Sequence, residues 1–524
     1  MRGIAGYVGL DAELAETVLR RMARQVGCAD EPVAMHRGIG LVAPIRSADG
    51  RYLMAYEGEL YNEAELLDAL APIEATGGPA LMLAAWARSG AAVLDHCNGR
   101  FALAILDTST GEVTLARDPI GHAPLYFAAD GSGRVAFASE LRAILAAGVV
   151  PRRPDDPTIY RYLALGVHDD TERTFFDRVT RLQPGELVVI SPTGELRRET
   201  YTGLFRELDH LATGHRSAGA GDRAPSAVGD QVAAAIGAAI ERRMVSDAPA
   251  GASLAGTPDL DRLADDLPDL LDCQQQPVGS IAGYADYCLM REASRQVSVL
   301  VDRSAASELV LEQLRQTGQP PLRLRLRRRS IVPPAELLGP GFPDDARAAP
   351  AGPGGRSAEQ LLRRRLPGLL RCQDRNGARF GVRRREPYLD PYLLRVLWRL
   401  DPAALRAVTA DLPPAPATTP PPDRWPAPLA ALAGELFGSE RFAARPYVDA
   451  QAVRRAYRAG ELDPAFGWRL VNVELWLRGL VDRDPTLPPA ATFVAHYARP
   501  VVTAPADPPV RPAGGDLITV DAGG

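Results

Sequence analysis

Residues 98–116 read Asn-Gly-Arg-Phe-Ala-Leu-Ala-Ile-Leu-Asp-Thr-Ser-Thr-Gly-Glu-Val-Thr-Leu-Ala. The runs Asn98–Leu106 and Glu112–Ala116 are apolar and rich in strand-forming residues, and Asp107–Gly111 between them is polar and ends in glycine. This pattern predicts two strands joined by a turn. Further strands are predicted at Gly3–Gly9 and Arg51–Tyr61. Helical periodicity is found at Ala12–Gln25, Pro79–Ser89 and Gln231–Met244. Many short strands with few helices favour a layered, largely antiparallel N-terminal domain.

A second informative stretch is Ser246–Leu260, SDAPAGASLAGTPDL. The apolar run Ala250–Leu254 predicts a buried strand, and the residues after it predict a tight turn and a helix. A loop between a parallel strand and a helix N-terminus favours anion binding. However, Pro258 lacks an N–H group, and Thr257 places a branched side chain where a phosphate would need room. A phosphate loop and an ordinary strand-to-helix turn both remain open.

The composition is that of a water-soluble globular protein with room for two or three domains. The chain has 524 residues, 46% of them hydrophobic and 24% charged, with a net charge of −5. This balance predicts no overall attraction to nucleic acid or to an anionic membrane. The sequence contains no lysine, so all 60 basic residues are arginine. Any mechanism that requires a lysine is therefore excluded.

The cysteines and the apolar runs indicate a compartment. The five cysteines are odd in number and lack metal-ligand spacing, which predicts buried or free thiols in a reducing cytosol. No leader of the charged-then-apolar type opens the chain, and no apolar run approaches 18 residues. We expect a cytoplasmic protein that neither is secreted nor spans a membrane.

Several short motifs occur in the order in which asparagine synthetases carry them. They are Gly3-Ile4-Ala5-Gly6, Gly58-Glu59-Leu60-Tyr61-Asn62, Asn98-Gly99-Arg100-Phe101-Ala102, Leu115-Ala116-Arg117-Asp118, Pro124-Leu125-Tyr126 and Phe137-Ala138-Ser139-Glu140-Leu141. The chain resembles the glutamine-hydrolysing asparagine synthetase family. Asp374-Arg375-Asn376, Arg385 and Leu389-Asp390 resemble the substrate side of that family's second domain.

The resemblance implies a two-domain fold. It predicts an αββα glutamine amidotransferase type 2-like domain of the Ntn (N-terminal nucleophile) type at residues 1–205 and a linker at 206–226. A trimmed parallel α/β domain, of the asparagine-synthetase-like ATP-pyrophosphatase type, is expected at 227–500. The Pro-, Ala- and Gly-rich residues 501–524 predict a disordered tail.

The glutaminase site that the resemblance implies is degraded. The position of the cysteine nucleophile holds Arg2, which cannot act as a nucleophile at neutral pH. The position of the oxyanion-binding asparagine holds Glu57, whose carboxylate would repel an oxyanion. The acidic residue that would hold the glutamine amine aligns with Gly77. Gly58 and Glu59 remain as residual pocket candidates, and Arg37 is either a carboxylate-binding arginine or a salt-bridge partner.

The implied ATP site is degraded as well. In the pyrophosphate loop only Gly256 and Asp259 match, and Asp259 is either a magnesium ligand or a charge at a helix N-terminus. The chain then passes almost directly to Leu267–Gln276, so the family's nucleoside-binding segment is missing. Ser307 occupies the position of a metal-binding aspartate, and only Glu308 matches beside it, as a cap or an ion-pair partner. We expect no resident metal.

Clusters of arginine are a further feature of the sequence, besides the loss of the family's catalytic residues. Leu322–Arg329 reads LRLRLRRR, and further arginines occur at Arg363–Arg365 and Arg383–Arg385. Alternating Leu and Arg predicts an amphipathic strand with a basic face. That face is solvated, binds an acidic partner, or binds nucleic acid or phosphate; the net negative charge argues against nucleic acid.

Three functions follow from these observations. The first is a non-catalytic subunit or scaffold, a pseudoenzyme in specialised-metabolite or peptide biosynthesis. It would need no cofactor, and it would bind a protein partner, either an active relative or a biosynthetic enzyme, in a homo- or hetero-oligomer. The second is an ATP- and magnesium-dependent ligase that forms amide bonds without glutamine, of the asparagine, macrolactam or β-lactam synthetase type. The third is an arginine-rich binding module for an acidic partner.

Overall fold

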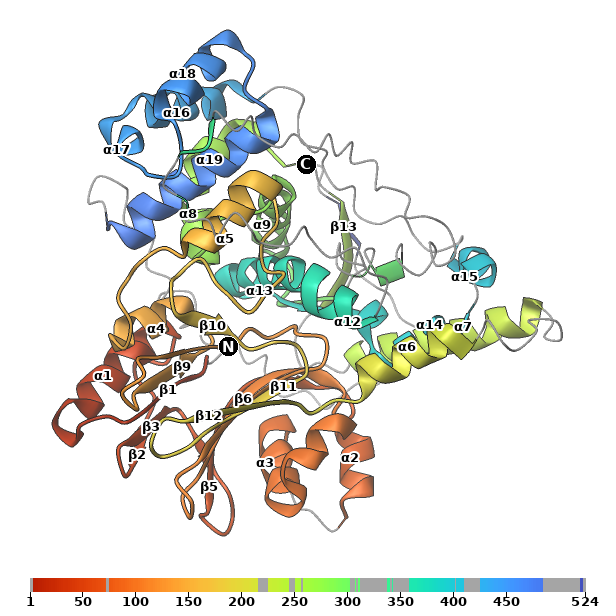
Figure 1. Cartoon of the computed structure of the whole chain (residues 1–524). Coiled ribbons are helices and arrows are strands. Elements are labelled where there is room, and N and C mark those ends of the chain that lie inside the picture. The colour runs from red at the N-terminus through yellow and green to blue at the C-terminus, as the bar shows by residue number, and fades with distance from the viewer. Residues whose placement is uncertain are drawn as a thin grey trace.

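Two antiparallel sheets of six strands each form the N-terminal domain (Figure 1). Across the first sheet lie β10 (Val179–Arg181), β8 (Tyr126–Ala129), β9 (Val135–Ala138), β1 (Ala5–Val8), β3 (Ile39–Val42) and β2 (Val33–His36). Across the second lie β12 (Leu196–Thr200), β11 (Glu186–Ile190), β7 (Val113–Arg117), β6 (Gly99–Asp107), β5 (Tyr52–Leu60) and β4 (Ile45–Arg46). The strand pair expected at residues 98–116 is confirmed as β6 and β7.

The structure is a computed structural model. It describes residues 3–71, 75–214, 225–244, 250–255, 258–301, 307, 310–311, 337–339, 342, 358–400, 402–409, 425–483 and 519–521.

Helices cover the outer faces of the two sheets. Against the first sheet pack α1 (Ala12–Gln25) and α4 (Leu141–Ala147); on the second lie α2 (Glu63–Ala69), α3 (Gly78–Ser89) and the 3-10 helix η1 (Gly90–His96). The faces between the sheets bury an apolar core that includes Leu41, Leu106 and Phe137. The expected αββα layering is therefore confirmed for this domain.

Beyond the two sheets, the described residues are largely helical. The helix α5 (Asp156–Tyr160) and the π-helix η2 (Arg161–Leu165) come between α4 and β10 in the chain. The described helices of the second region, which follows β12 in the chain, are α6 (Leu204–Gly214), α7 (Pro225–Met244), η3 (Leu260–Arg262), α8 (Leu263–Gln274), α9 (Ala282–Ala293), α12 (Ala358–Gln360), η5 (Leu361–Arg365), α13 (Pro367–Phe380), η6 (Pro387–Leu389), α14 (Pro391–Trp398), α15 (Pro402–Thr409), α16 (Ala427–Gly438), α17 (Glu440–Ala443), α18 (Ala450–Ala459), α19 (Pro464–Trp476) and η7 (Leu477–Val481).

A small parallel sheet lies within this second region. Its order is β15 (Arg383–Arg385), β14 (Val299–Val301), β13 (Ala250–Ala255) and β16 (Thr519–Asp521), and every pairing is parallel. The strand expected at residues 250–254 is confirmed as β13. The strands are only three to six residues long, so the region is far more helical than the expected α/β domain.

Two expected irregular segments contain regular structure. Residues 204–214, which overlap the expected linker, form α6, because Leu204, Phe205 and Leu208 bury an apolar side against the second region. In the expected disordered tail, β16 adds to β13 at the edge of the parallel sheet. Residues 215–224, in the second half of that linker, lie outside the described residues.

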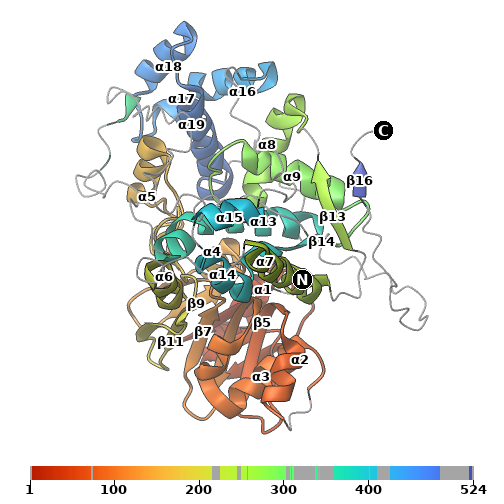
Figure 2. The same ribbon diagram turned by 90° about the vertical axis from the view of Figure 1, so that its right-hand side faces the viewer.

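The two parts share a core. Figure 2 shows α13, α14 and α7 in a band between the sheets below and helices α8, α9 and α16–α19 above. Side chains of α1 and α4 belong to the same buried cluster as those of α8 and α19. Phe175 of the N-terminal domain meets Trp476 of α19 edge-on, with ring centroids 5.6 Å apart.

The described residues bear on two of the expectations about compartment. All five cysteines lie within the described part of the chain, and none of them forms a disulfide. Among the described helices, none combines the length and the apolar character needed to cross a bilayer.

Candidate functional site

The residual pocket candidates Gly58 and Glu59 lie on β5, opposite Phe101 and Arg100 of β6, and Glu57, at the oxyanion position, lies opposite Ala102. Gly58 has a φ of 145°, and a Cβ atom there would lie 2.1 Å from the carbonyl oxygen of Arg100. Only glycine allows the two strands to approach so closely at this point. The retained glycine therefore has a structural reason, independent of any ligand.

The carboxylate of Glu59 is bound by two arginines of β15. Arg383 Nη1 donates to Glu59 Oε1 over 2.7 Å, and Arg385 donates through Nε and Nη2 over 2.8 Å each. Burial raises the pKa of the Glu59 carboxyl, but the hydrogen bonds and charge of Arg385 and the charge of Arg383 outweigh it and lower that pKa. Glu59 is thus an ionised group that already has two cationic partners from the second region.

Glu57 behaves differently from its neighbour two residues away. Burial, reinforced by the negative charge of Asp374, raises its pKa to about 7, against the opposing charges of Arg375 and Arg100. Ser139 hydrogen-bonds to the Glu57 carboxyl, while Glu57 Oε2 is buried and has no hydrogen-bond partner among the described residues. With a pKa of about 7, the Glu57 carboxyl is about half ionised at pH 7. That Glu57 repels an oxyanion stays a prediction.

Helix α13 carries the partners of this cluster. Arg100 pairs with Asp374, and Arg375 pairs both with Asp374 and with Glu140 at the start of α4. The side chains of all four are at most 8% exposed. Burial raises the pKa of Asp374, but Arg375 and Arg100 overcome this and lower it. We call the set Glu57, Glu59, Arg100, Glu140, Asp374, Arg375, Arg383 and Arg385 the charge seam.

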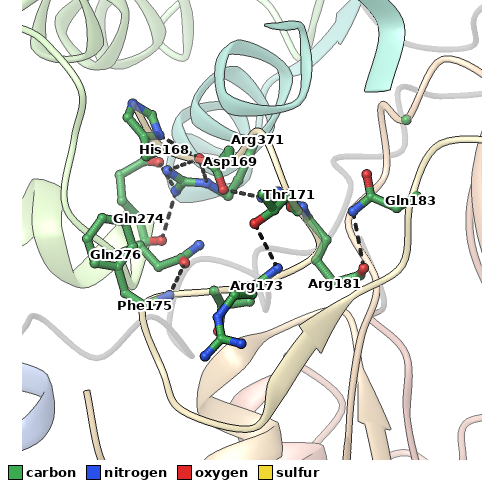
Figure 3. A network of polar contacts seen from close by, with 12 residues as sticks. His168, Asp169, Thr171, Arg173, Phe175, Arg181, Gln183, Gln274, Gln276 and Arg371 are labelled. Carbon is green, nitrogen blue, oxygen red and sulfur yellow. Dashed lines mark hydrogen bonds and ion pairs between the residues drawn. The ribbon is translucent and has the colours of Figure 1, made fainter. Parts of the chain in front are cut away.

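A second network of buried charges also involves α13 (Figure 3). The Asp169 carboxylate accepts a hydrogen bond from Arg371 Nε of α13 over 3.0 Å and forms an ion pair with Arg181. It also lies 2.8 Å from Nδ1 of His168. Burial raises the pKa of Asp169, yet Arg371 and Arg181 hold it well below its usual value. Arg371 also donates to Gln274 Oε1 over 3.0 Å, which ties α8 into the network.

Asp390 joins the two parts at a third point. Its oxygens accept Asn98 Nδ2 over 2.9 Å and Arg243 Nη1 over 2.5 Å, and they also cap the first turn of α14. Asn98, Arg100, Glu140, Asp374, Arg375, Arg385 and Asp390 all belong to the motifs that carry the family resemblance. In this protein those motif residues contact one another across the two parts of the chain.

The motif Arg117-Asp118 has a local structural task. The buried Arg117 guanidinium donates to the carbonyl oxygens of Ala123 and Leu182, each over 2.7 Å. Asp118 accepts the backbone N–H groups of residues 120–123, which folds the loop after β7. Gly121 in that loop has a φ of 83°.

The third pocket candidate, Arg37, is exposed in the turn between β2 and β3, with a φ of 47°, and no described hydrogen bond or ion pair joins it to Glu57 or Glu59. The structure therefore does not link Arg37 to the residual pocket. Gly77, at the position of the amine-binding acid, is the exposed residue that precedes α3, with open space around it. A Cβ atom on the next residue, Gly78, would lie 3.7 Å from Leu60 Cβ, so Gly77 lies near the end of β5.

The ATP-loop candidates are only partly described. Asp259 is exposed, and its Oδ1 accepts Asp261 N over 3.0 Å at the start of η3, which is the helix-terminal role we weighed. Ser307 is buried. Arg2, Gly256, Thr257, Glu308 and Leu322–Arg329 lie outside the described residues. No group of three potential metal ligands occurs among the residues that are described.

The arginine cluster Arg383–Arg385 is not the solvated basic face that the sequence suggested. The side chains of Arg384 and Arg385 are 5% and 6% exposed, and they pair with Asp286 and Glu59. Their acidic partners lie 98 and 326 residues away in the chain. The sequence signal that was missed is in α13, where Asp374 and Arg375 stand three and four residues after Arg371, the spacing that places side chains on one face of a helix.

Comparison with known proteins finds a family match for the first part of the chain. Residues 1–202 match the family described as "Glutamine amidotransferase domain". A putative glutamine-hydrolysing asparagine synthetase of Mycobacterium bovis is 41% identical over 103 residues, which are 19% of this chain and 16% of that protein. Glutamine-hydrolysing asparagine synthetase 3 of Bacillus subtilis is 29% identical over 147 residues, or 27% of this chain and 24% of that protein. The chain thus matches less than a quarter of the length of either relative.

Among solved structures, a glutamine phosphoribosylpyrophosphate amidotransferase from B. subtilis, complexed with ADP and GMP, is 16% identical. The similarity covers 48% of this chain and 60% of that one, with a TM-score of 0.27. By the family match and the asparagine synthetase relatives, residues 1–202 are a class II glutamine amidotransferase domain of the Ntn type, in a chain that is a distant and partial homologue of asparagine synthetases.

Proposed function

We propose that the amidotransferase domain of this protein does not hydrolyse glutamine and that the chain acts as a non-catalytic subunit or scaffold. The observation that carries the proposal is the binding of Glu59 by Arg383 and Arg385. A glutamine substrate brings an α-ammonium group. Because Gly77 stands where the amine-binding acid would be, Glu59 is the carboxylate that the residual pocket candidates still offer to that group. That carboxylate is already neutralised by two guanidinium groups of the same chain.

The free energies favour the state in which Glu59 stays paired with Arg383 and Arg385 over a state in which it binds a glutamine substrate. Breaking a buried ion pair costs about 3–5 kcal/mol, whereas a ligand with a millimolar dissociation constant gains only about 4 kcal/mol on binding. A small amino acid that had to displace the two arginines would therefore gain almost nothing. Glu57 at the oxyanion position and Gly77 at the position of the amine-binding acid act in the same direction.

The scaffold role follows from what the motif residues do instead. They hold the amidotransferase domain against α13, β15 and α14 through the charge seam and Asp390. We propose that this rigid two-part body serves a protein partner, such as an active relative or a biosynthetic enzyme of specialised metabolism, and that it needs neither ATP nor magnesium.

The proposal is tested by turnover in two assays on the full chain. The first follows the release of glutamate from glutamine, and the second follows pyrophosphate release from ATP with a carboxylate substrate. The B. subtilis asparagine synthetase serves as the positive control. We expect no turnover in either assay. Glutamate release that is lost in Glu59→Gln would contradict the proposal, and pyrophosphate release would favour the ligase alternative.

A further inference from the structure

A cavity of about 570 Å³ lies where α1 and α4 of the amidotransferase domain meet α8 and η7 of the second region. Its charged lining consists of four arginines and one aspartate: Arg21, Arg142, Arg152, Arg483 and Asp272. This volume is within the range of small-molecule sites in proteins. The cavity shares no lining residue with the charge seam or with the strand-to-helix turn at residues 250–260.

The charges of this cavity do not balance. Arg142 is paired with Asp272, and it also donates to the carbonyl oxygen of the same residue over 2.9 Å. No ion pair to a described carboxylate involves Arg21, Arg152 or Arg483. The Arg152 guanidinium donates to the carbonyl oxygen of Leu480 over 2.5 Å, which fixes its position at the wall. All three arginines line the cavity, Arg21 and Arg483 as exposed residues and Arg152 as a half-buried one, and none of them has a counter-ion among the described carboxylates.

We propose that this cavity binds a phosphorylated small molecule with two or three negative charges, held by Arg21, Arg152 and Arg483. Guanidinium groups match phosphate oxygens in geometry and form charge-assisted hydrogen bonds with them. Two of these arginines come from the amidotransferase side and one from the end of η7, so the ligand joins the two parts of the protein.

The electrostatics of Arg152 agree with this assignment. Burial lowers its pKa to about 10, and repulsion by Arg483 and Arg142 contributes to the decrease. An anion among these groups would remove that repulsion. Because binding involves both parts of the chain, it should also raise the melting temperature; a ligand at one hundred times its dissociation constant adds about 2.7 kcal/mol of stability.

The test is calorimetric titration of the full chain at constant ionic strength with four probes: inorganic phosphate, pyrophosphate, ATP and uncharged adenosine. We expect pyrophosphate and ATP to bind and adenosine not to bind. Equal affinity for pyrophosphate and ATP would identify the phosphates alone as the recognised group. Tighter binding of ATP would show that the nucleoside is recognised as well.

Variants assign the binding to the cavity. The double variant Arg21→Gln/Arg483→Gln should weaken pyrophosphate binding at least about tenfold, because it removes two charge-assisted contacts. The single variant Arg152→Gln should also weaken pyrophosphate binding. The double variant Arg455→Gln/Arg458→Gln, on the exposed face of α18, should leave binding unchanged. The proposal is overturned if no anion binds up to about 10 mM, or if the cavity double variant binds as tightly as the wild type.

Discussion

At the scale of single residues, Glu57 makes the protein sensitive to pH. Its pKa is 4.5 in a model peptide and about 7 in the folded protein, so the folded state holds its proton more tightly. Stability from this residue is therefore complete below pH 4.5 and is lost as the pH rises toward 7, by about 3 kcal/mol. Glu57→Gln should come close to the wild type at pH 4 and exceed it at pH 8, as measured by urea unfolding. The exposed Glu112→Gln is the control, and equal pH profiles for Glu57→Gln and the wild type would refute this role.

Glu59 should matter more for stability than an exposed glutamate in a similar pair. Glu59→Gln leaves Arg385, 6% exposed, without its counter-charge, and we expect a loss of about 3 kcal/mol in the free energy of unfolding. The matched control is Glu207→Gln, which breaks the pair with Arg395 at side-chain exposures of 40% and 28% and should cost less than about 1 kcal/mol. Equal losses in the free energy of unfolding for the two variants would show that the Glu59 ion pair contributes no more than an exposed pair does.

At the scale of secondary-structure elements, the pairing of β5 with β6 depends on Gly58. Gly58→Ala should cost about 3 kcal/mol or more, because the new Cβ meets the backbone of Arg100 and the φ of 145° is strained for alanine. Gly237→Ala in α7 has open space around its Cβ and should stabilise the helix by about 0.5–1 kcal/mol. Chemical denaturation measures both, and a neutral Gly58→Ala would mean that the strands can separate at this point.

The elements also show what the sequence could and could not predict. Helix α1 was predicted with the bounds that the structure has, and β6 and β7 were predicted as a pair, because local periodicity and a short turn determine them. The charge seam could not be predicted, because its pairs join residues such as Arg100 and Asp374 that lie 274 positions apart. A local run such as Arg383–Arg385 looks like a solvated basic patch until its distant acidic partners are known.

At the scale of the whole molecule, the two parts should unfold together. Separation would expose the shared core at Phe175 and Trp476 and would leave the buried charges of α13 without partners. We therefore expect one cooperative transition in scanning calorimetry, reported equally by signals from both parts. Two resolved transitions would contradict the tight coupling.

Our proposal depends on Arg383 and Arg385 occupying the Glu59 carboxylate that would bind the α-ammonium group of glutamine. The decisive experiment is calorimetric titration of the full chain with L-glutamine. We expect no measurable binding to the wild-type protein at millimolar glutamine. Saturable binding that disappears in Glu59→Gln, but persists in Glu207→Gln, would show that the pocket is open and would refute the proposal.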